Sequence, residues 1–299
     1  LYKMRDWIII IEDDVCHLKL GVLFELSQLV DYHQIKTING GWKLNFQSGD
    51  IAYSMLSEWM ETGKVWRFYP DTNVNNELRY EPNDLYYVSG DQWHLNNYGQ
   101  NNGNSGIDIN SQNAWESYDG EGIRIGVIDD GIDYNNPDLS PNFVSSLSYD
   151  YCDDDSNVMP LDSDGDEEID WHGTAVAGIV SAQGNNSIGI SGVSYNSDLV
   201  GIRLIAETCN SAFTIDESEA YALNHRLDEI DIYVNSWGPA DTGNLLGEIG
   251  PLALSALEEG VSEGRNGFGS VYVWAAGNGN QNGDSSNKDA YANSRYTIA

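Results

Sequence analysis

Near-continuous apolar runs alternate with helical patterns through most of the chain. Runs of this kind are typical of parallel strands that are buried on both faces, and apolar residues at helical spacing lie between them. The alternation predicts an α/β fold, a parallel sheet flanked by helices. Strands are expected at 124–129, 199–205, 230–236, 270–276 and 296–299, and helices at 174–181, 216–223 (behind a capping box of Thr214 and Glu217) and 252–259.

The front of the chain has a different pattern. Residues 40–46 and 65–69 read as strands, and residues 51–62 have a helical pattern that Gly63 closes. This order predicts a small α+β module.

A polar stretch separates the module from the rest of the chain. Residues 71–91 are rich in Asn, Asp and Pro, and we expect them to form a linker. We therefore divide the chain into an N-terminal segment with its linker, residues 1–80, and a larger domain, residues 81–299.

The charge is strongly negative. The chain has 47 acidic and 14 basic residues, a formal net charge of −33. This charge repels nucleic acid and anionic membranes and attracts cations, whether calcium ions or basic peptides. Most of the acids are expected to be solvated surface groups. No apolar run reaches membrane length, since the burst at 7–11 is short and three acids follow it. We expect neither a nucleic-acid partner nor a membrane segment.

The cysteines do not identify a site. Cys16, Cys152 and Cys209 have neither metal-binding nor redox spacing. Their odd number leaves the disulfide state open.

Candidate chemistry begins at the end of the run 124–129. Asp129 and Asp130 close this run, and the pair could be a metal site, an acid–base pair or a helix cap. His172 opens a predicted helix, where a histidine is more often structural than catalytic. If a carboxylate binds its Nδ1 atom, however, the tautomer is fixed and His172 becomes a candidate general base.

A third block follows the run 270–276. Asn278 lies between two glycines, which a plain turn would explain equally well. An Asn at the end of a strand can also direct its amide N–H at a developing oxyanion. Because ligands bind beyond the carboxyl ends of parallel strands, we expect Asp129 and Asn278 at the same edge of the sheet.

The three blocks, in this order, resemble the subtilase family of serine peptidases, over residues 91–299. The resemblance implies a subtilisin-like fold in which Asp129 orients His172, His172 is the general base and Asn278 is the oxyanion donor. The family's nucleophilic serine belongs to a Gly-Thr-Ser block, and no such triplet occurs in this sequence. We therefore expect an inactive fragment with a truncated sheet, whose nucleophile lies beyond residue 299 in an active parent enzyme.

Two further blocks resemble the kexin and furin-like convertase branch, namely Ser-Trp-Gly-Pro-Ala-Asp at 236–241 and Asp-Ala-Tyr-Ala-Asn-Ser at 289–294. The resemblance implies that Asp241 and Asp289 lie at the base of the primary specificity pocket. A buried carboxylate pair is costly unless a cation neutralises it, so such a pocket favours Arg or Lys side chains.

The same resemblance implies the other substrate contacts. Asp130 and Asp170 would bind a second basic side chain of the substrate, and Glu219 would bind a more distant one. Residues 236–238 would pair with the substrate. Ala240, Ala290 and Ile169 depart from the pattern, so a basic residue before the cleaved bond is expected, while the choice between a single basic residue and a strict dibasic pair stays open. The implied substrate-binding residues are Asp130, Asp170, Glu219, Ser236, Trp237, Gly238, Asp241 and Asp289.

The resemblance also implies Ca²⁺ as a cofactor, held by oxygen ligands. The family's strong site would join a loop to distant acids. The implied ligands are Asp84, Asp138, Gln183, Asn186, Ile188 and Ile190 in that strong site, Asp150, Asp155 and Asn157 in a second, and Asp284 with Asp241 in half of a third. The acidic stretch 162–168 lacks the full calcium-loop pattern and is expected to be a solvated loop.

Residues 43–80 resemble the C-terminal half of a subtilase propeptide, whereas residues 1–42 match no family. Together these features predict a secreted or lumenal, calcium-dependent serine endopeptidase. Its partners would be polypeptides with basic residues at the cleavage site and its own propeptide. The alternative is a non-catalytic calcium-binding or adhesive module on a subtilase-like scaffold.

Overall fold

The structure is a computed structural model. It describes residues 6–10, 29–34, 41–61, 65, 67–70, 81–161, 171–206, 209 and 213–299. The chain forms two compact units, Leu1–Leu78 and Arg79–Ala299.

The described residues of the first unit include an antiparallel sheet and a helix. The strands β1 (Asp6–Ile10), β2 (Leu29–Gln34), β3 (Gly41–Phe46) and β4 (Arg67–Pro70) lie in the order β2-β3-β1-β4, and α2 spans Gly49–Glu61. The predicted strand, helix and strand correspond to β3, α2 and β4. The strands β1 and β2 were not predicted, although β1 is central in the sheet.

The core of this unit follows from two periodicities. Trp7 and Ile9 are alternate residues of β1, and both are buried. Leu44 of β3 is buried as well. Leu56 and Trp59 of α2 are three residues apart on one helical face and are also buried in the same cluster.

The second unit contains a parallel sheet of six strands. The order is β10-β9-β8-β5-β7-β6, and every pairing is parallel. The predicted α/β class is therefore confirmed. Three of the four central strands fall within the predicted runs, and the fourth, β7, begins one residue before its run. The strands are β5 (Arg124–Asp129), β6 (Tyr149–Asp150), β7 (Asp198–Arg203), β8 (Ile232–Asn235), β9 (Val271–Trp274) and β10 (Thr297–Ile298).

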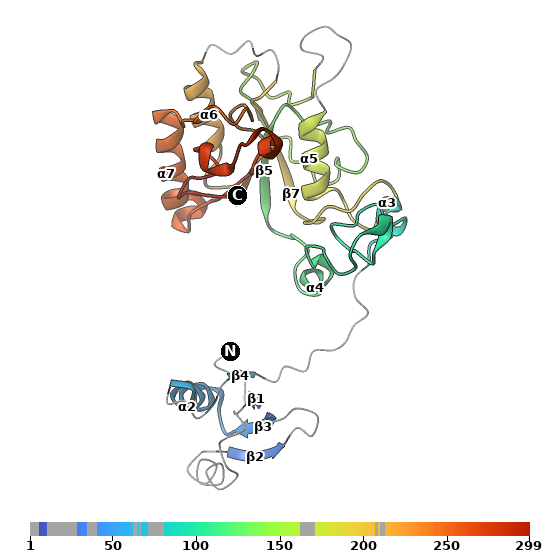
Figure 1. Cartoon of the computed structure of the whole chain (residues 1–299), viewed down its shortest axis with the longest axis vertical. Coiled ribbons are helices and arrows are strands. Elements are labelled where there is room, and N and C mark those ends of the chain that lie inside the picture. The colour runs from blue at the N-terminus through green and yellow to red at the C-terminus, as the bar shows by residue number, and fades with distance from the viewer. Residues whose placement is uncertain are drawn as a thin grey trace. The chain divides into compact units, whose positions relative to one another are not determined.

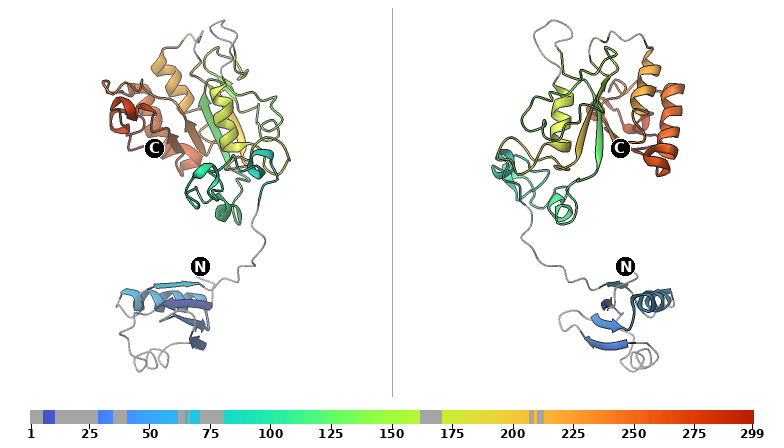
Figure 2. Two further views of the ribbon diagram at one scale, coloured as in Figure 1. Left: turned by 45° about the vertical axis from the view of Figure 1, so that its right-hand side comes forward. Right: turned by 180° about the vertical axis from the view of Figure 1, so that it is seen from behind.

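Helices cover both faces of this sheet. Figure 1 and Figure 2 show α5 (His172–Ser181) on one face, with α6 (Ile215–Leu223) and α7 (Pro251–Gly267) together on the other. Two hydrophobic clusters match this arrangement, one including residues of α5 and the other residues of α6 and α7. The Thr214–Glu217 capping box of α6 is present as predicted.

Short helices precede and follow these elements. They are α3 (Leu85–Val88), α4 (Ser111–Trp115), η1 (Gln100–Asn102), η2 (Gly279–Asn282) and η3 (Ser286–Lys288). The presence of α3 corrects the linker prediction, because residues 81–91 fold against the domain. Asp84 is fully buried, and Tyr87 belongs to a buried cluster with Trp115.

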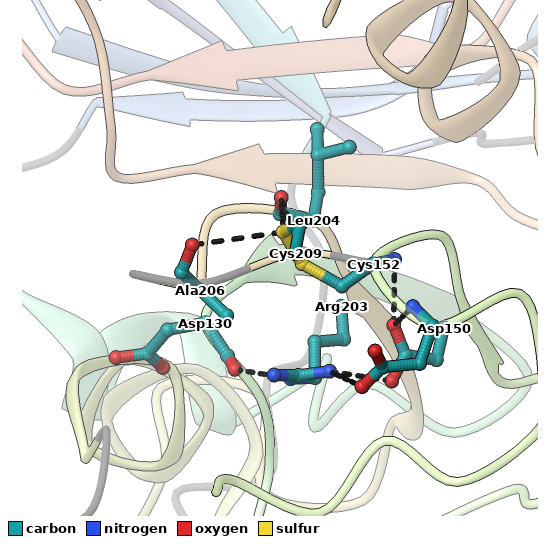
Figure 3. Close-up of a disulfide and its surroundings, with 8 residues drawn as sticks. Asp130, Asp150, Cys152, Arg203, Leu204, Ala206 and Cys209 are labelled. Atoms are coloured by element: carbon teal, nitrogen blue, oxygen red, sulfur yellow. Dashed lines mark hydrogen bonds and ion pairs between the residues drawn. A yellow bond between two sulfur atoms is a disulfide. The ribbon is translucent and has the colours of Figure 1, made fainter. Parts of the chain in front are cut away.

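Cys152 and Cys209 form a disulfide, which settles the pairing that the sequence left open (Figure 3). Cys16 lies outside the described residues, as does the acidic stretch 162–168. No helix in the described ranges is long and apolar enough to cross a membrane.

Candidate active site

Asp129 and His172 form a hydrogen-bonded pair. Asp129 is the last residue of β5 and His172 is the first of α5, and the Nδ1 atom of His172 lies 2.7 Å from Oδ1 of Asp129. The Asp129 side chain is buried, at 4% exposed, whereas that of His172 is 59% exposed. With the Nδ1–H group donated to Asp129, Nε2 is the imidazole atom that remains to accept a proton.

The charge of Asp129 supports a protonated imidazole. The Asp129 hydrogen bond raises the pKa of His172 above its ordinary value of 6.5. Oδ1 also accepts the Asp130 N–H group, whereas Oδ2 is buried and accepts no hydrogen bond from the described residues. The carboxylate therefore favours the protonated form of the imidazole over the neutral form.

Asp130 holds the helix that carries His172. Its two oxygens accept backbone N–H groups of His172, at 3.0 Å, and Gly173, at 2.6 Å. A carboxylate at this position satisfies the free N–H groups of a helix start and interacts favourably with the helix dipole. Burial raises the pKa of Asp130. Of the three interpretations of the acid pair, the geometry of Asp130 matches a helix cap.

Gly173 permits the helix to reach the strand. A Cβ atom on Gly173 would lie 2.3 Å from the carbonyl oxygen of Gly131 and 2.8 Å from Cβ of Asp129. Both distances are shorter than real Cβ contacts, so only glycine allows the start of α5 to approach the end of β5 this closely. The glycine therefore sets the separation of the Asp129 and His172 side chains.

A buried arginine, which the sequence analysis missed, supports the same strand end. Arg203 pairs with Asp129 in the β5–β7 register and is completely buried. Its Nε atom donates to the carbonyl oxygen of Asp130 at 3.0 Å, and its Nη1 atom donates to Asp150 at 2.7 Å and Asp153 at 2.9 Å (Figure 3). The only signal in the sequence is a single cation inside an apolar run.

Asn278 lies near the carboxyl end of another strand of the same sheet. It follows β9 by four residues and precedes η2, and it is exposed. Its backbone N–H group donates to Oδ2 of Asp241 at 2.7 Å. The strands β5, β8 and β9 are parallel neighbours. Asp129 and Asn278 therefore both lie at the edge of the sheet where the carboxyl ends of its strands meet.

A cavity of about 230 Å³ adjoins Asn278 and brings together the predicted specificity acids. Asp289 lies against the backbone of the predicted substrate-pairing segment, since a Cβ atom on Gly238 would be 2.8 Å from its Oδ2 atom. Oδ1 of Asp289 accepts the N–H groups of Tyr291 and Ala292. The cavity is lined by charged residues and small loop residues, among them Asp241, Asp284, Lys288, Asp289, Ala240 and Gly277.

Glu219 is linked to this region through Tyr291. The Tyr291 hydroxyl donates to Oε2 of Glu219 at 2.7 Å, and burial raises the pKa of Glu219. The Tyr291 ring stacks on Trp274 and contacts Trp237 edge-on. Trp274 Nε1 in turn donates to the carbonyl oxygen of Trp237 at 2.6 Å, which fixes the segment that begins at Ser236. Asp170 lies outside the described residues.

Asp84 and Asp138 form a second cluster of buried acids. Both are buried, at 0% and 7% exposed. The two oxygens of Asp138 accept the Asn186 side-chain amide at 2.6 Å and the Ile190 N–H group at 2.8 Å. The oxygens of Asp84 accept backbone N–H groups of Asn185 and Asn186.

The surrounding loop closes around these acids. The Gln183 N–H group donates to the carbonyl oxygen of Asp138, and the Ile188 N–H group donates to the Asn186 side chain. Burial, and also the charge of Asp84, raises the pKa of Asp138. Two like charges buried together are costly without a cation, and carboxylate oxygens are among the ligands that Ca²⁺ takes.

In the second expected calcium site, an arginine side chain binds one of the predicted ligands. Oδ1 of Asp150 accepts the Cys152 and Asp153 N–H groups, and Oδ2 accepts Arg203. Asp155 lies beside Asp150 through a backbone bridge and accepts the Asn157 N–H group. The three predicted ligands are therefore neighbours, but the guanidinium already binds the carboxylate of Asp150.

Comparisons with known proteins place this chain in a family. The model of the Subtilase family matches residues 120–299. Neuroendocrine convertase 2 of Homo sapiens is 43% identical over 228 residues, which are 75% of this chain and 34% of the relative. PC3-like endoprotease variant B of Hydra vulgaris is 43% identical over 219 residues, which are 73% and 29% of the two chains. The serine protease of Aeromonas sobria has a TM-score of 0.54 at 25% identity, covering 70% of this chain and 34% of that chain. The chain thus spans about a third of the length of the curated relatives it matches.

Proposed function

Because this chain belongs to the subtilase family, we propose that the protein that carries it is a serine endopeptidase, calcium-dependent and selective for basic residues at the cleavage site. The observation that supports the proposal most directly is the 2.7 Å contact between His172 and the buried Asp129. A base that is fixed by a carboxylate at a sheet edge is the arrangement that activates a serine hydroxyl.

In this proposal the residues act in sequence on a peptide carbonyl. His172 takes the proton of the nucleophilic hydroxyl at Nε2 and later returns it to the leaving amine. Asp129 stabilises the imidazolium that forms, and the Asn278 side chain donates to the oxyanion. No Gly-Thr-Ser triplet occurs in the 299 residues, so the proposal requires a serine outside this sequence.

Selectivity for a basic side chain rests on the acid-lined cavity. Asp241, Asp284 and Asp289 line it with one cation, Lys288. A guanidinium or ammonium group from the substrate would bind these carboxylates with charge-assisted hydrogen bonds. The relatives named convertase and endoprotease support the same class of reaction. Glu219, held by Tyr291, is proposed to serve a more distant basic residue.

Calcium would act as a structural ion at Asp84 and Asp138. Asp84 and Asp138 would hold the ion, whose charge would offset that of the two carboxylates and so stabilise the 183–190 loop. The resolved contacts of Asn186 and Ile190 with Asp138 already place that loop around the acids. Asp130 remains a proposed contact for a second basic side chain, although both of its oxygens accept N–H groups of α5.

The compartment and the partners are part of the same proposal. The Cys152–Cys209 disulfide supports an oxidising location, secreted or within the lumen of the secretory pathway. The compact first unit supports a propeptide role for residues 1–80, with polypeptides as the substrates.

Expression of the complete open reading frame tests the function. Chromogenic peptides that end in Arg or Lys should be hydrolysed, and EDTA should reduce the rate. Peptides with an acidic or apolar residue at that position serve as controls. Equal hydrolysis of the control peptides would contradict the proposed specificity. A complete lack of hydrolysis would favour the non-catalytic module.

A further inference from the structure

A second cavity, of about 320 Å³, lies beside β6, the edge strand of the parallel sheet. Four aromatic rings and an imidazole form most of its wall, and a single acid is the one charged group among them. The lining residues are Tyr149, Tyr151, Asp154, Phe213, Tyr221 and His225.

Strand and helix geometry bring these rings together. Tyr149 of β6 and Tyr151 after it are alternate residues, so both project to the face of the sheet that α6 covers. Their ring centroids are 4.9 Å apart, and the Tyr151 ring lies nearly parallel to that of Tyr221 in α6, 6.2 Å away at 12°. Phe213 contacts Tyr221 edge-on at 5.0 Å, and His225 contacts Tyr151 edge-on at 5.7 Å. The five rings therefore form one continuous wall.

The polar atoms of this wall already bind one another. The Tyr149 hydroxyl donates to Oδ1 of Asp154 at 2.7 Å. Nε2 of His225 lies 2.6 Å from the carbonyl oxygen of Leu147, which can only accept, so Nε2 carries the hydrogen and Nδ1 accepts the Tyr151 hydroxyl at 3.0 Å. Burial lowers the pKa of His225 below its ordinary value of 6.5, so the imidazole is neutral at pH 7. The wall thus offers aromatic surface and a carboxylate, without a positive charge.

This combination suits a cation with an apolar stem. The faces of aromatic rings attract ammonium and guanidinium groups that lie within about 6 Å of the ring centre. The methylene stem of Lys or Arg packs on apolar surface while its head stays near water. Asp154 is exposed, and its carboxylate can bind that head at the rim of the cavity.

The aromatic cavity is next to the acid proposed for a distant basic residue. A neighbouring cavity of about 190 Å³ contains Glu219 and shares two of its lining residues, Tyr151 and Phe213, with the aromatic cavity. Glu219 also precedes Tyr221 by two residues in α6. A polypeptide whose side chain reaches Glu219 is therefore one cavity away from the aromatic wall.

We propose that the aromatic cavity is a further subsite for a basic side chain of the polypeptide substrate, farther from the cleaved bond than the residue that Glu219 binds. The identity of the polypeptide rests on the proposed function, whereas the preference for a cation rests on the rings and Asp154. Citrulline has the shape of Arg without its charge, so the subsite should bind Arg in preference to citrulline.

Peptide binding to the full-length protein tests this proposal. Fluorescence anisotropy would compare labelled peptides that end in Arg and have either Arg or citrulline at one position farther from that end. At one such position Arg should bind roughly 3- to 30-fold more tightly than citrulline. Tyr221→Leu should remove most of this preference, whereas Tyr221→Phe, which keeps the ring, should retain it. Tyr118→Leu changes an exposed tyrosine outside the cavity and is the matched control.

Asp154→Asn decides the question even if Tyr221→Leu does not fold, because it changes an exposed acid and keeps an acceptor for the Tyr149 hydroxyl. It should lower the preference for Arg. A preference that is absent at every position, or unchanged in Asp154→Asn, overturns the proposal. Loss of the same preference in Glu219→Gln overturns it as well, because the two cavities would then bind one side chain.

The binding measurement is independent of turnover. A protein that prefers Arg over citrulline in this way but hydrolyses no peptide would overturn the proposed peptidase activity and support the subsite. Hydrolysis without this preference would do the reverse.

Discussion

Oδ2 of Asp241 accepts the backbone N–H group of Asn278 at 2.7 Å. One hydrogen bond thus connects a proposed specificity acid to the proposed oxyanion donor. In the proposed function, this single carboxylate would couple the binding of a basic side chain in the cavity to the placement of Asn278.

Two substitutions at Asp241 separate its charge from its hydrogen bond. Asp241→Asn keeps an acceptor oxygen and loses the charge, so KM for Arg-terminated peptides should rise by roughly 10- to 100-fold with kcat little changed, since hydrogen bonds to charged groups contribute about 1.5–3 kcal/mol. Asp241→Ala also removes the acceptor, and kcat should fall as well. Steady-state kinetics of the full-length protein measure both constants. Equal effects of the two variants would contradict the coupling.

The His172–Asp129 bond predicts the pH dependence of turnover. The reaction needs neutral His172, and Asp129 raises the pKa of His172, so the acid limb of kcat/KM should lie above pH 6.5, the ordinary histidine value. Asp129→Asn removes the cause of the shift, and the limb should move to lower pH. The equivalent change in serine peptidase triads lowers kcat by about 10⁴-fold. Glu121→Gln, an exposed acid, is the matched control and should leave the profile unchanged.

Calcium should stabilise the fold through Asp138. At a calcium concentration about 100-fold above Kd, binding to the native state adds about 2.7 kcal/mol to the free energy of unfolding. EDTA should therefore lower the Tm of the wild type, whereas Asp138→Asn should have a low Tm with or without EDTA. Differential scanning calorimetry of the full-length protein makes the comparison. If EDTA lowers the Tm of Asp138→Asn as much as that of the wild type, the ion binds at another site.

Arg203, which is completely buried, should be highly sensitive to substitution. Arg203→Met leaves Asp150 buried without its cation, and breaking such a pair costs about 3–5 kcal/mol. Asp153, whose side chain is 24% exposed, binds the same guanidinium. Asp153→Asn is the matched control, and it should cost about 1 kcal/mol or less. Urea denaturation measures both, and similar losses for the two variants would show that Asp153 is the main partner.

The sequence predicts the central strands and the place of Asp129 at the sheet edge for clear physical reasons, whereas the pairing of Asp129 with His172 is predicted from the resemblance to the subtilase family. Parallel strands buried on both faces give long apolar runs, and a residue that closes such a run must lie at the edge of the sheet. The strand β1 of the antiparallel sheet shows only the short apolar burst at 7–11, which three acids follow. Its five residues are recognisable only once β3 and β4 provide their registers, from residues far along the chain.

The partners of single residues are harder to predict. Arg203 binds acids that precede it by 50 residues or more, and nothing local identifies them. Three cysteines permit three different pairs, so the choice of Cys152 and Cys209 needed the fold. Asp84 looked like part of a linker because its burial depends on a loop about 100 residues later.

At position 173 the proposed activity depends on the absence of a Cβ atom. The contacts with Gly131 and Asp129 leave no space for even a methyl group. No codon change at position 173 can encode a smaller residue, so any missense allele would move α5 outward and separate the imidazole from its carboxylate. Such alleles should behave as null alleles although every reacting group stays chemically intact.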